Sequence, residues 1–194
     1  SAKSDAADMS LDDPHVASVL EEDGMLQLVR SIPVQAVTGW KSGVSVALPP
    51  EYAHANALVV AGVGGSAMGA DLVRGITRGD STIPVVISRD YVLPGFVGPE
   101  TLVVCSSYSG NTGETLSAFQ QAQIAGAKII IFGAEGRLLE VGAAYPKIRI
   151  RTRGMPRSVL VESVLAFLGL FRQLGLAKDI EEPSSLRTFL EDAI

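Results

Sequence analysis

Cysteine and histidine are scarce in this sequence of 194 residues, and both shortages limit the chemistry that it can support. The single cysteine, Cys105, excludes a disulfide within the chain, which favours a reducing cytoplasm. Its place inside an apolar run predicts a buried structural thiol. The only histidines, His15 and His54, do not lie at metal-ligand spacing from a cysteine or a carboxylate. We therefore expect a cytoplasmic protein whose site needs no metal.

Long apolar runs and an excess of basic residues are also missing. No apolar run reaches the roughly 18 residues that a membrane helix needs, and no signal-peptide pattern opens the chain, so neither segment is predicted. The net charge of -5 and the pI near 5.0 argue against nucleic acid or an anionic membrane as a partner. With 47% hydrophobic and 19% charged residues, the composition predicts one globular core with short extensions.

Hydroxyl groups are concentrated in one short loop at residues 106–112, which reads Ser-Ser-Tyr-Ser-Gly-Asn-Thr. The apolar run before it suits a strand buried on both faces, and a helical pattern follows. Donors in this serine loop can converge on one anion, and Asn111 or Thr112 can cap the helix in a capping box with Glu114. The alternative is a turn rich in serine and asparagine only because these residues cap helices well. The loop holds more hydroxyls than a cap uses, which favours a phosphate cradle.

A second loop of the same kind follows the apolar run at residues 57–61. This glycine loop reads Gly-Val-Gly-Gly-Ser-Ala-Met-Gly over residues 62–69. Its glycines allow the backbone to approach a ligand, and Ser66 is expected to be both a helix cap and a donor to that ligand. The helical pattern after it predicts one shared face, formed by Met68, Leu72, Val73 and Ile76.

Strand and helix patterns alternate along the core of the chain. The predicted strands cover residues 57–63, 84–88, 101–105, 128–132 and 147–151, and the predicted helices cover 66–77, 112–125, 137–144 and 158–174. This alternation predicts a three-layer α/β fold with a five-stranded parallel sheet and helices on both faces. In the flavodoxin-like order 2-1-3-4-5, strands 1 and 3 are neighbours, so both loops reach one site. Pro84 then starts an edge strand, where it costs no ladder bond.

A dinucleotide site is the rival interpretation of the glycine loop. Residues 62–67 fit the fingerprint G-x-G-x-x-G/A, and Asp90 lies roughly where a ribose-binding acid would stand. An NAD-dependent oxidoreductase is therefore an alternative. Its strand order would separate the two loops and leave the serine loop without a role. When joined, the loops instead suit a phosphate group.

These motifs resemble those of the sugar isomerase (SIS) domain. The resemblance is carried by Gly64-Gly65-Ser66, the serine loop and Met155-Pro156-Arg157, and it is greatest to the N-terminal half of the bifunctional phosphoglucose/phosphomannose isomerases. It covers about residues 23–174. It implies an aldose–ketose isomerisation through an enediol, from glucose 6-phosphate or mannose 6-phosphate to fructose 6-phosphate, without a metal, a nucleotide or another cofactor.

The resemblance also implies the site residues. The substrate-binding set is Gly64, Gly65, Ser66, Ser107, Ser109, Asn111 and Thr112, of which Ser107, Ser109 and Thr112 match the phosphate-binding positions. Arg157 matches the arginine that stabilises the charge of the enediolate, a role that suits a planar cation beside an oxyanion. The alternative is a solvated arginine that caps a loop. Arg151 and Arg153 are expected to face solvent.

Three segments are predicted: an N-terminal helical extension at 1–50 with a helix starting at Asp13-Pro14, an SIS domain at 51–176, and a linker with an apolar-striped helix at 177–194. The resembling family has a second SIS domain, which carries its catalytic glutamate and histidine, and neither has a match here. Glu114 looks like a cap, and Glu162 lies on a helix that is apolar nearly all round. Such a helix predicts cover by a second SIS domain or a homodimer partner. A binding module without catalysis is therefore a further hypothesis.

Overall fold

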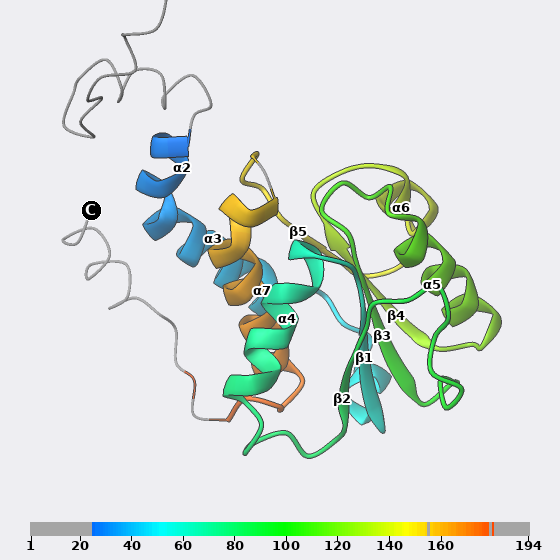
Figure 1. Cartoon of the computed structure of the whole chain (residues 1–194). Helices are drawn as coiled ribbons and strands as arrows, with labels where there is room; N and C mark the ends of the chain where they lie inside the picture. Colours follow the sequence, from blue (N-terminus) through cyan, green and yellow to red (C-terminus); the bar gives the residue numbers. More distant parts are fainter. Residues whose placement is uncertain (1–24, 155, 179, 181–194) are drawn as a thin grey trace, which may run out of the picture.

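A five-stranded parallel sheet forms the centre of the computed structural model, which describes residues 25–154, 156–178 and 180 (Figure 1). The strands are β1 (Ala57–Ala61), β2 (Val85–Ser88), β3 (Thr101–Ser106), β4 (Lys128–Gly133) and β5 (Lys147–Arg149). Their order is β2-β1-β3-β4-β5, and every pairing is parallel. Both the predicted α/β class and the predicted strand order are confirmed. Pro84 directly precedes the edge strand β2, as expected.

Alternate residues of the central strands divide the core into two layers of apolar side chains. Leu58, Val60 and their neighbours in the sheet pack against α4 (Gly65–Ile76) and α7 (Leu160–Gln173). Val59, Val103 and Cys105 lie on the other face, against α5 (Gly113–Ile124) and α6 (Arg137–Val141). Burial raises the pKa of the Cys105 thiol to about 12, so the predicted structural thiol is confirmed.

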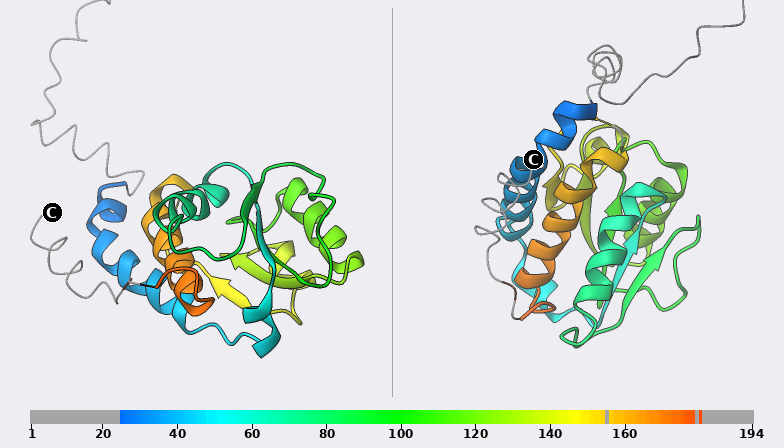
Figure 2. Two further views of the ribbon diagram at one scale, coloured as in Figure 1. Left: turned by 90° about the horizontal axis from the view of Figure 1, so that it is seen from below. Right: turned by 60° about the vertical axis from the view of Figure 1, so that its left-hand side comes forward.

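An outer layer is added by α3 (Ile32–Val44), which packs along α7 (Figure 2). Glycines allow this close approach. A Cβ on Gly39 would collide with the carbonyl oxygen of Glu162, and one on Gly43 would collide with that of Ala166. α3 and α4 of the same chain therefore cover α7. The partner predicted from the apolar character of this helix stays a prediction.

The four large apolar residues of α4 that were expected to share one face do not all lie together. Val73 is buried together with Ala70, whereas Met68, Leu72 and Ile76 are 47%, 48% and 63% exposed. The small residues Ala67, Gly69 and Ala70 form the buried face because α4 packs closely on η2 (Pro156–Val159) and α7. The large apolar side chains are therefore left as a stripe on the outside.

Shorter elements complete the described chain, namely α2 (Met25–Arg30) and the 3-10 helix η1 (Pro50–His54). The helix predicted from Asp13-Pro14 and the apolar stripe predicted from Leu186 to Ala193 lie outside the described residues. The boundaries of the three predicted segments stay predictions. Within the described part, no helix has the length and apolar character required to cross a bilayer.

Candidate functional site

The two candidate loops meet at the carboxyl ends of β1 and β3. The backbone N–H of Tyr108 donates to the hydroxyl of Ser66 over 3.0 Å, and the Ser106 hydroxyl donates to the Ser66 carbonyl oxygen over 2.6 Å. A Cβ on Gly62 would stand 2.7 Å from the Ser106 carbonyl oxygen, so only glycine allows the loops to approach this closely. Neighbouring strands and direct hydrogen bonds therefore join the glycine loop and the serine loop into one surface.

The serine loop is held in shape by its own polar groups. The hydroxyls of Ser107 and Thr112 share a hydrogen bond of 2.8 Å, and the Asn111 amide donates to the Ser109 carbonyl oxygen over 3.0 Å. The Asn111 side-chain oxygen accepts from the backbone N–H of Arg137, the first residue of α6, over 3.2 Å. Ser109 remains exposed, whereas Ser107 is buried. These contacts hold the serine loop in one conformation.

The predicted helix caps are not formed. Thr112 is the N-cap residue of α5, but its hydroxyl pairs with Ser107 instead of a helix amide, and no side chain caps this helix. Gly64, with a φ of 57°, precedes α4 in the place expected for Ser66, whose hydroxyl is taken by Tyr108. Among the described residues, the first amides of α5 therefore have no oxygen partner, and they carry the positive end of its dipole to the serine loop.

A third segment is tied to the serine loop through the side chain of Tyr108. Its hydroxyl donates to the Thr152 carbonyl oxygen and accepts from the Gly154 N–H, both over 3.0 Å. The fully buried carboxylate of Glu162 on α7 accepts from the backbone N–H of Arg151 over 2.7 Å and from that of Thr152 over 2.9 Å. Tyr108 and Glu162 thus position the turn that leads toward Arg157.

Neither role was predicted from sequence. Glu162 was not chosen as a functional residue because its helix is apolar nearly all round. The two groups that donate to it are backbone amides, and a sequence does not show which amides a carboxylate will meet. The structure places the backbone of Arg157 in η2, which contacts α4, the helix after the glycine loop. The side chain of Arg157 lies outside the described part of the structure. Arg151 and Arg153 are exposed, as expected.

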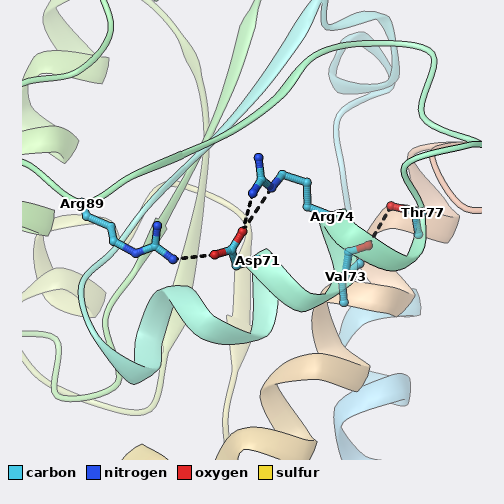
Figure 3. Close-up of polar contacts among 5 residues, drawn as sticks. All are labelled: Asp71, Val73, Arg74, Thr77 and Arg89. Atoms are coloured by element: carbon cyan, nitrogen blue, oxygen red, sulfur yellow. Dashed lines mark hydrogen bonds and ion pairs between the residues drawn. The ribbon is translucent and has the colours of Figure 1, made fainter.

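Beside the glycine loop lies a hollow of about 590 Å³, lined by Gly64, Gly65, Met68, Asp71, Leu72 and Arg89. Asp71 accepts from Arg89 over 2.7 Å and from Arg74 over 2.7 and 3.1 Å (Figure 3). The hydrogen bond from Arg89, followed by that from Arg74, holds the pKa of the Asp71 carboxyl below its usual value. The Asp71–Arg89 pair ties α4 to the segment after β2, at the rim of the hollow.

The dinucleotide alternative finds no support in this geometry. The sheet has the order that places β3 beside β1, and the Asp90 carboxylate accepts from the N–H of Tyr91 over 2.6 Å, within its own turn. No group of three His, Cys, Asp or Glu side chains suited to a metal ion is found in the residues that the structure describes. The chemistry of the joined loops is that of hydroxyl and amide donors, which bind phosphate.

Strand order, paired loops and helix arrangement together define the SIS domain fold, and solved structures agree. The C-terminal domain of glucosamine-fructose-6-phosphate aminotransferase from Francisella tularensis matches 87% of this chain and 53% of its own, with a TM-score of 0.68 and 10% identity. The Vibrio vulnificus NanR protein complexed with ManNAc-6P matches 92% of this chain and 70% of its own, with a TM-score of 0.57 and 13% identity. No protein-family model matches the chain.

Within this class, the chain is a homologue of the bifunctional phosphoglucose/phosphomannose isomerases. It is 38% identical to that of Caldicellulosiruptor bescii over 160 residues, which are 81% of this chain and 47% of the relative. It is 36% identical to that of Thermoplasma acidophilum over 134 residues, which are 69% of this chain and 41% of the relative. The chain thus spans about half the length of these curated relatives.

Proposed function

We propose that this chain is the phosphosugar-binding SIS domain of a cytoplasmic aldose–ketose isomerase that acts on hexose 6-phosphates. The reaction would interconvert glucose 6-phosphate or mannose 6-phosphate with fructose 6-phosphate, and the names of the homologues support it. The observation that carries the proposal is the hydrogen bond between Tyr108 and Ser66, which brings two donor-rich loops to one site.

In this proposal the serine loop holds the phosphate. Its phosphate-binding residues are Ser107, Ser109, Asn111 and Thr112. The free amides at the start of α5 add further donors and the positive end of the helix dipole. The glycine loop faces the sugar, with Gly64, Gly65 and Ser66 beside its hydroxyl groups. Each neutral hydrogen bond contributes only about 0.5 to 1.5 kcal/mol net, so several must converge on one ligand to give useful affinity.

Arg157 is the catalytic residue that we propose in this chain. Isomerisation removes a proton from one carbon of the opened sugar and returns it to the neighbouring carbon, and the intermediate carries negative charge on an enediolate oxygen. A fixed guanidinium beside that oxygen would stabilise the charge. Tyr108 and Glu162 act on this step as positioning residues, because they hold residues 151–154 just before Arg157.

The base that moves the proton is assigned to a second SIS domain, in the same protein or in a homodimer partner. The support is the length of the curated relatives, together with the exposed apolar stripe of α4, formed by Met68, Leu72 and Ile76. The stripe runs from the hollow beside Gly64 and Gly65, so a partner on α4 would reach the sugar. The expected docking surface is therefore α4 rather than α7.

Calorimetry with fructose 6-phosphate tests the binding site. Ser109→Ala should weaken binding by about 0.5 to 3 kcal/mol, or about 2- to 160-fold, because it removes one hydroxyl donor to the phosphate. Ser81→Ala is the matched control, since Ser81 lies in the turn before the amino end of β2 and should leave the affinity unchanged. Binding of NADH, with no response to the sugar phosphate, would favour the dinucleotide alternative instead.

A second candidate function is a sugar-phosphate-binding module without catalysis. The fold likeness to the NanR protein complexed with ManNAc-6P favours it, as does the lack of a recognisable proton-transferring base in this sequence. Both candidates predict phosphosugar binding, and only turnover separates them.

A further inference from the structure

Positively charged side chains are concentrated along the edge strand β5. Arg149 and Arg151 are exposed. Ile148, which precedes Arg149, is 0% exposed, and Ile150, which lies between the two arginines, is 5% exposed. Since alternate residues of an extended chain share a face, both arginines project from the side opposite the two isoleucines. α3 lies next to this strand (Figure 2) and brings Lys41 to the same place.

Together these elements enclose a basic groove of about 570 Å³, lined by Thr38, Lys41, Ser42, Ser45, Val46, Lys147, Arg149 and Arg151. The Ser42 hydroxyl donates to the Arg149 carbonyl oxygen over 3.4 Å and so joins its two walls. The lining contains four cations, three hydroxyls and no carboxylate. None of the residues of the glycine loop or the serine loop contributes to it.

The four cations of the basic groove have no acidic partner among the residues that the structure describes. Every ion pair found there involves another cation, namely Arg74, Arg89, Lys128 or Arg153. In the described part of the chain, Lys147 donates to the carbonyl oxygens of Ala143 and Tyr145 and to no carboxylate. Four like charges repel one another, and the whole chain has a net charge of -5, so neither fold stability nor overall composition accounts for this cluster.

The shape and lining of the groove indicate what would neutralise it. Its volume is within the range of about 300 to 1,000 Å³ that small-molecule sites occupy. It has no aromatic side chain on which a base could stack, and the net charge of the chain opposes long polyanions. Lysine, arginine and hydroxyl donors instead match phosphate and carboxylate oxygens.

We propose that the basic groove between α3 and β5 is a binding site for a small anion that carries two or more phosphate or carboxylate groups. No residue of the serine loop lines this groove, although Arg149 and Arg151 also line a neighbouring hollow together with Tyr108. The proposal does not depend on the function proposed for the serine loop. Because the backbone N–H of Arg151 also donates to the Glu162 carboxylate, a ligand in the groove touches the segment that leads to Arg157.

Pyrophosphate is a suitable probe, and calorimetry at low ionic strength measures its affinity. Lys41→Ala/Arg149→Ala removes two of the four cations and should weaken pyrophosphate binding at least about tenfold, since charge-assisted hydrogen bonds are among the strongest in proteins. Arg74→Ala/Arg78→Ala removes the same charge from α4 and the turn after it, and it should leave the affinity unchanged. Added salt should weaken the binding to the wild-type chain.

The thermal unfolding temperature of each variant shows whether it is folded, and Ser109→Ala separates the two sites. Pyrophosphate binding that survives Ser109→Ala but is lost in Lys41→Ala/Arg149→Ala would support the proposal. Equal affinity in the wild-type chain and in Lys41→Ala/Arg149→Ala, or binding that disappears with Ser109→Ala, would overturn it. A failure to bind fructose 6-phosphate would affect only the function of the serine loop.

Discussion

At the scale of single residues, the hydroxyl of Tyr108 connects two separate segments of the candidate site. It links the serine loop to residues 152 and 154 through two hydrogen bonds. Tyr108→Phe removes both and should lower the free energy of unfolding by about 1 to 3 kcal/mol, since each such bond contributes about 0.5 to 1.5 kcal/mol. Urea denaturation measures this loss.

Tyr91→Phe is the matched control for that variant. Its hydroxyl has no hydrogen-bond partner in the part of the chain that the structure describes, and the side chain is 54% exposed. It should therefore denature at the same urea concentration as the wild-type chain. Equal stability of the Tyr108 and Tyr91 variants would show that the Tyr108 contacts contribute nothing to holding the turn.

At the scale of elements, the glycine contact between α3 and α7 is the packing feature most sensitive to a single methyl group. Gly39→Ala places a Cβ against the carbonyl oxygen of Glu162, so the helices must separate. We expect a loss of about 1 to 3 kcal/mol in the free energy of unfolding, as for other overpacked core positions. Because the shift moves Glu162, affinity for fructose 6-phosphate should also fall.

Gly75→Ala provides the control for this packing prediction. Gly75 lies inside α4, and a Cβ there meets nothing within 4 Å. The substitution should leave the protein unchanged or stabilise it by about 0.5 to 1 kcal/mol through helix propensity alone. If Gly39→Ala proved as stable as Gly75→Ala, the close packing of α3 on α7 would be wrong.

The arrangement of the strands could be predicted from sequence, because only one order joins the two donor-rich loops and leaves Pro84 at an edge. Strand and helix boundaries were predicted to within a few residues, since turns rich in glycine, serine and proline mark them. The buried face of α4 was not predicted. Its pattern of large apolar residues points outward, while Ala67 and Ala70 permit close packing inward.

Long-range polar contacts account for the rest of what the sequence could not predict. Serine and threonine are good helix caps, but in the folded chain the Ser66 hydroxyl meets an amide 42 residues away, and the Thr112 hydroxyl meets Ser107. Capping propensity reflects only the hydrogen bonds that a side chain can make with nearby backbone groups. It does not predict a partner that is distant in the sequence and that folding brings close. Glu162 was overlooked for the same reason.

At the scale of the whole molecule, the proposed division of labour predicts that binding and turnover separate. A positioned general base contributes about 10² to 10⁴ in rate, and we can assign none within these 194 residues. In a coupled assay, the chain alone should interconvert glucose 6-phosphate and fructose 6-phosphate at most feebly. With a second SIS domain, in the same chain or as a partner subunit, it should be active.

A variant in the exposed stripe of α4 tests the docking surface in the same assay. Ile76→Glu places a charge in the exposed stripe of α4, outside the lining of the hollow beside the glycine loop, and should abolish the gain from the second domain while leaving fructose 6-phosphate binding to the chain intact. Full activity of the 194 residues alone, lost on Arg157→Ala but independent of any partner, would show that the base lies in this chain. Binding without turnover in every combination would favour the non-catalytic module.

The pairing of α3 with α7 also determines how the nascent chain is assembled. α3 ends at Val44, and α7 begins only at Leu160. A ribosome that adds about 5 to 20 residues per second needs roughly 6 to 23 s to make the stretch between them. The sheet face under α5 and α6 can be covered once α6 has emerged, whereas the opposite face has only α4 until α7 is made. Chains stalled before Leu160 should therefore expose one apolar sheet face and depend on chaperones.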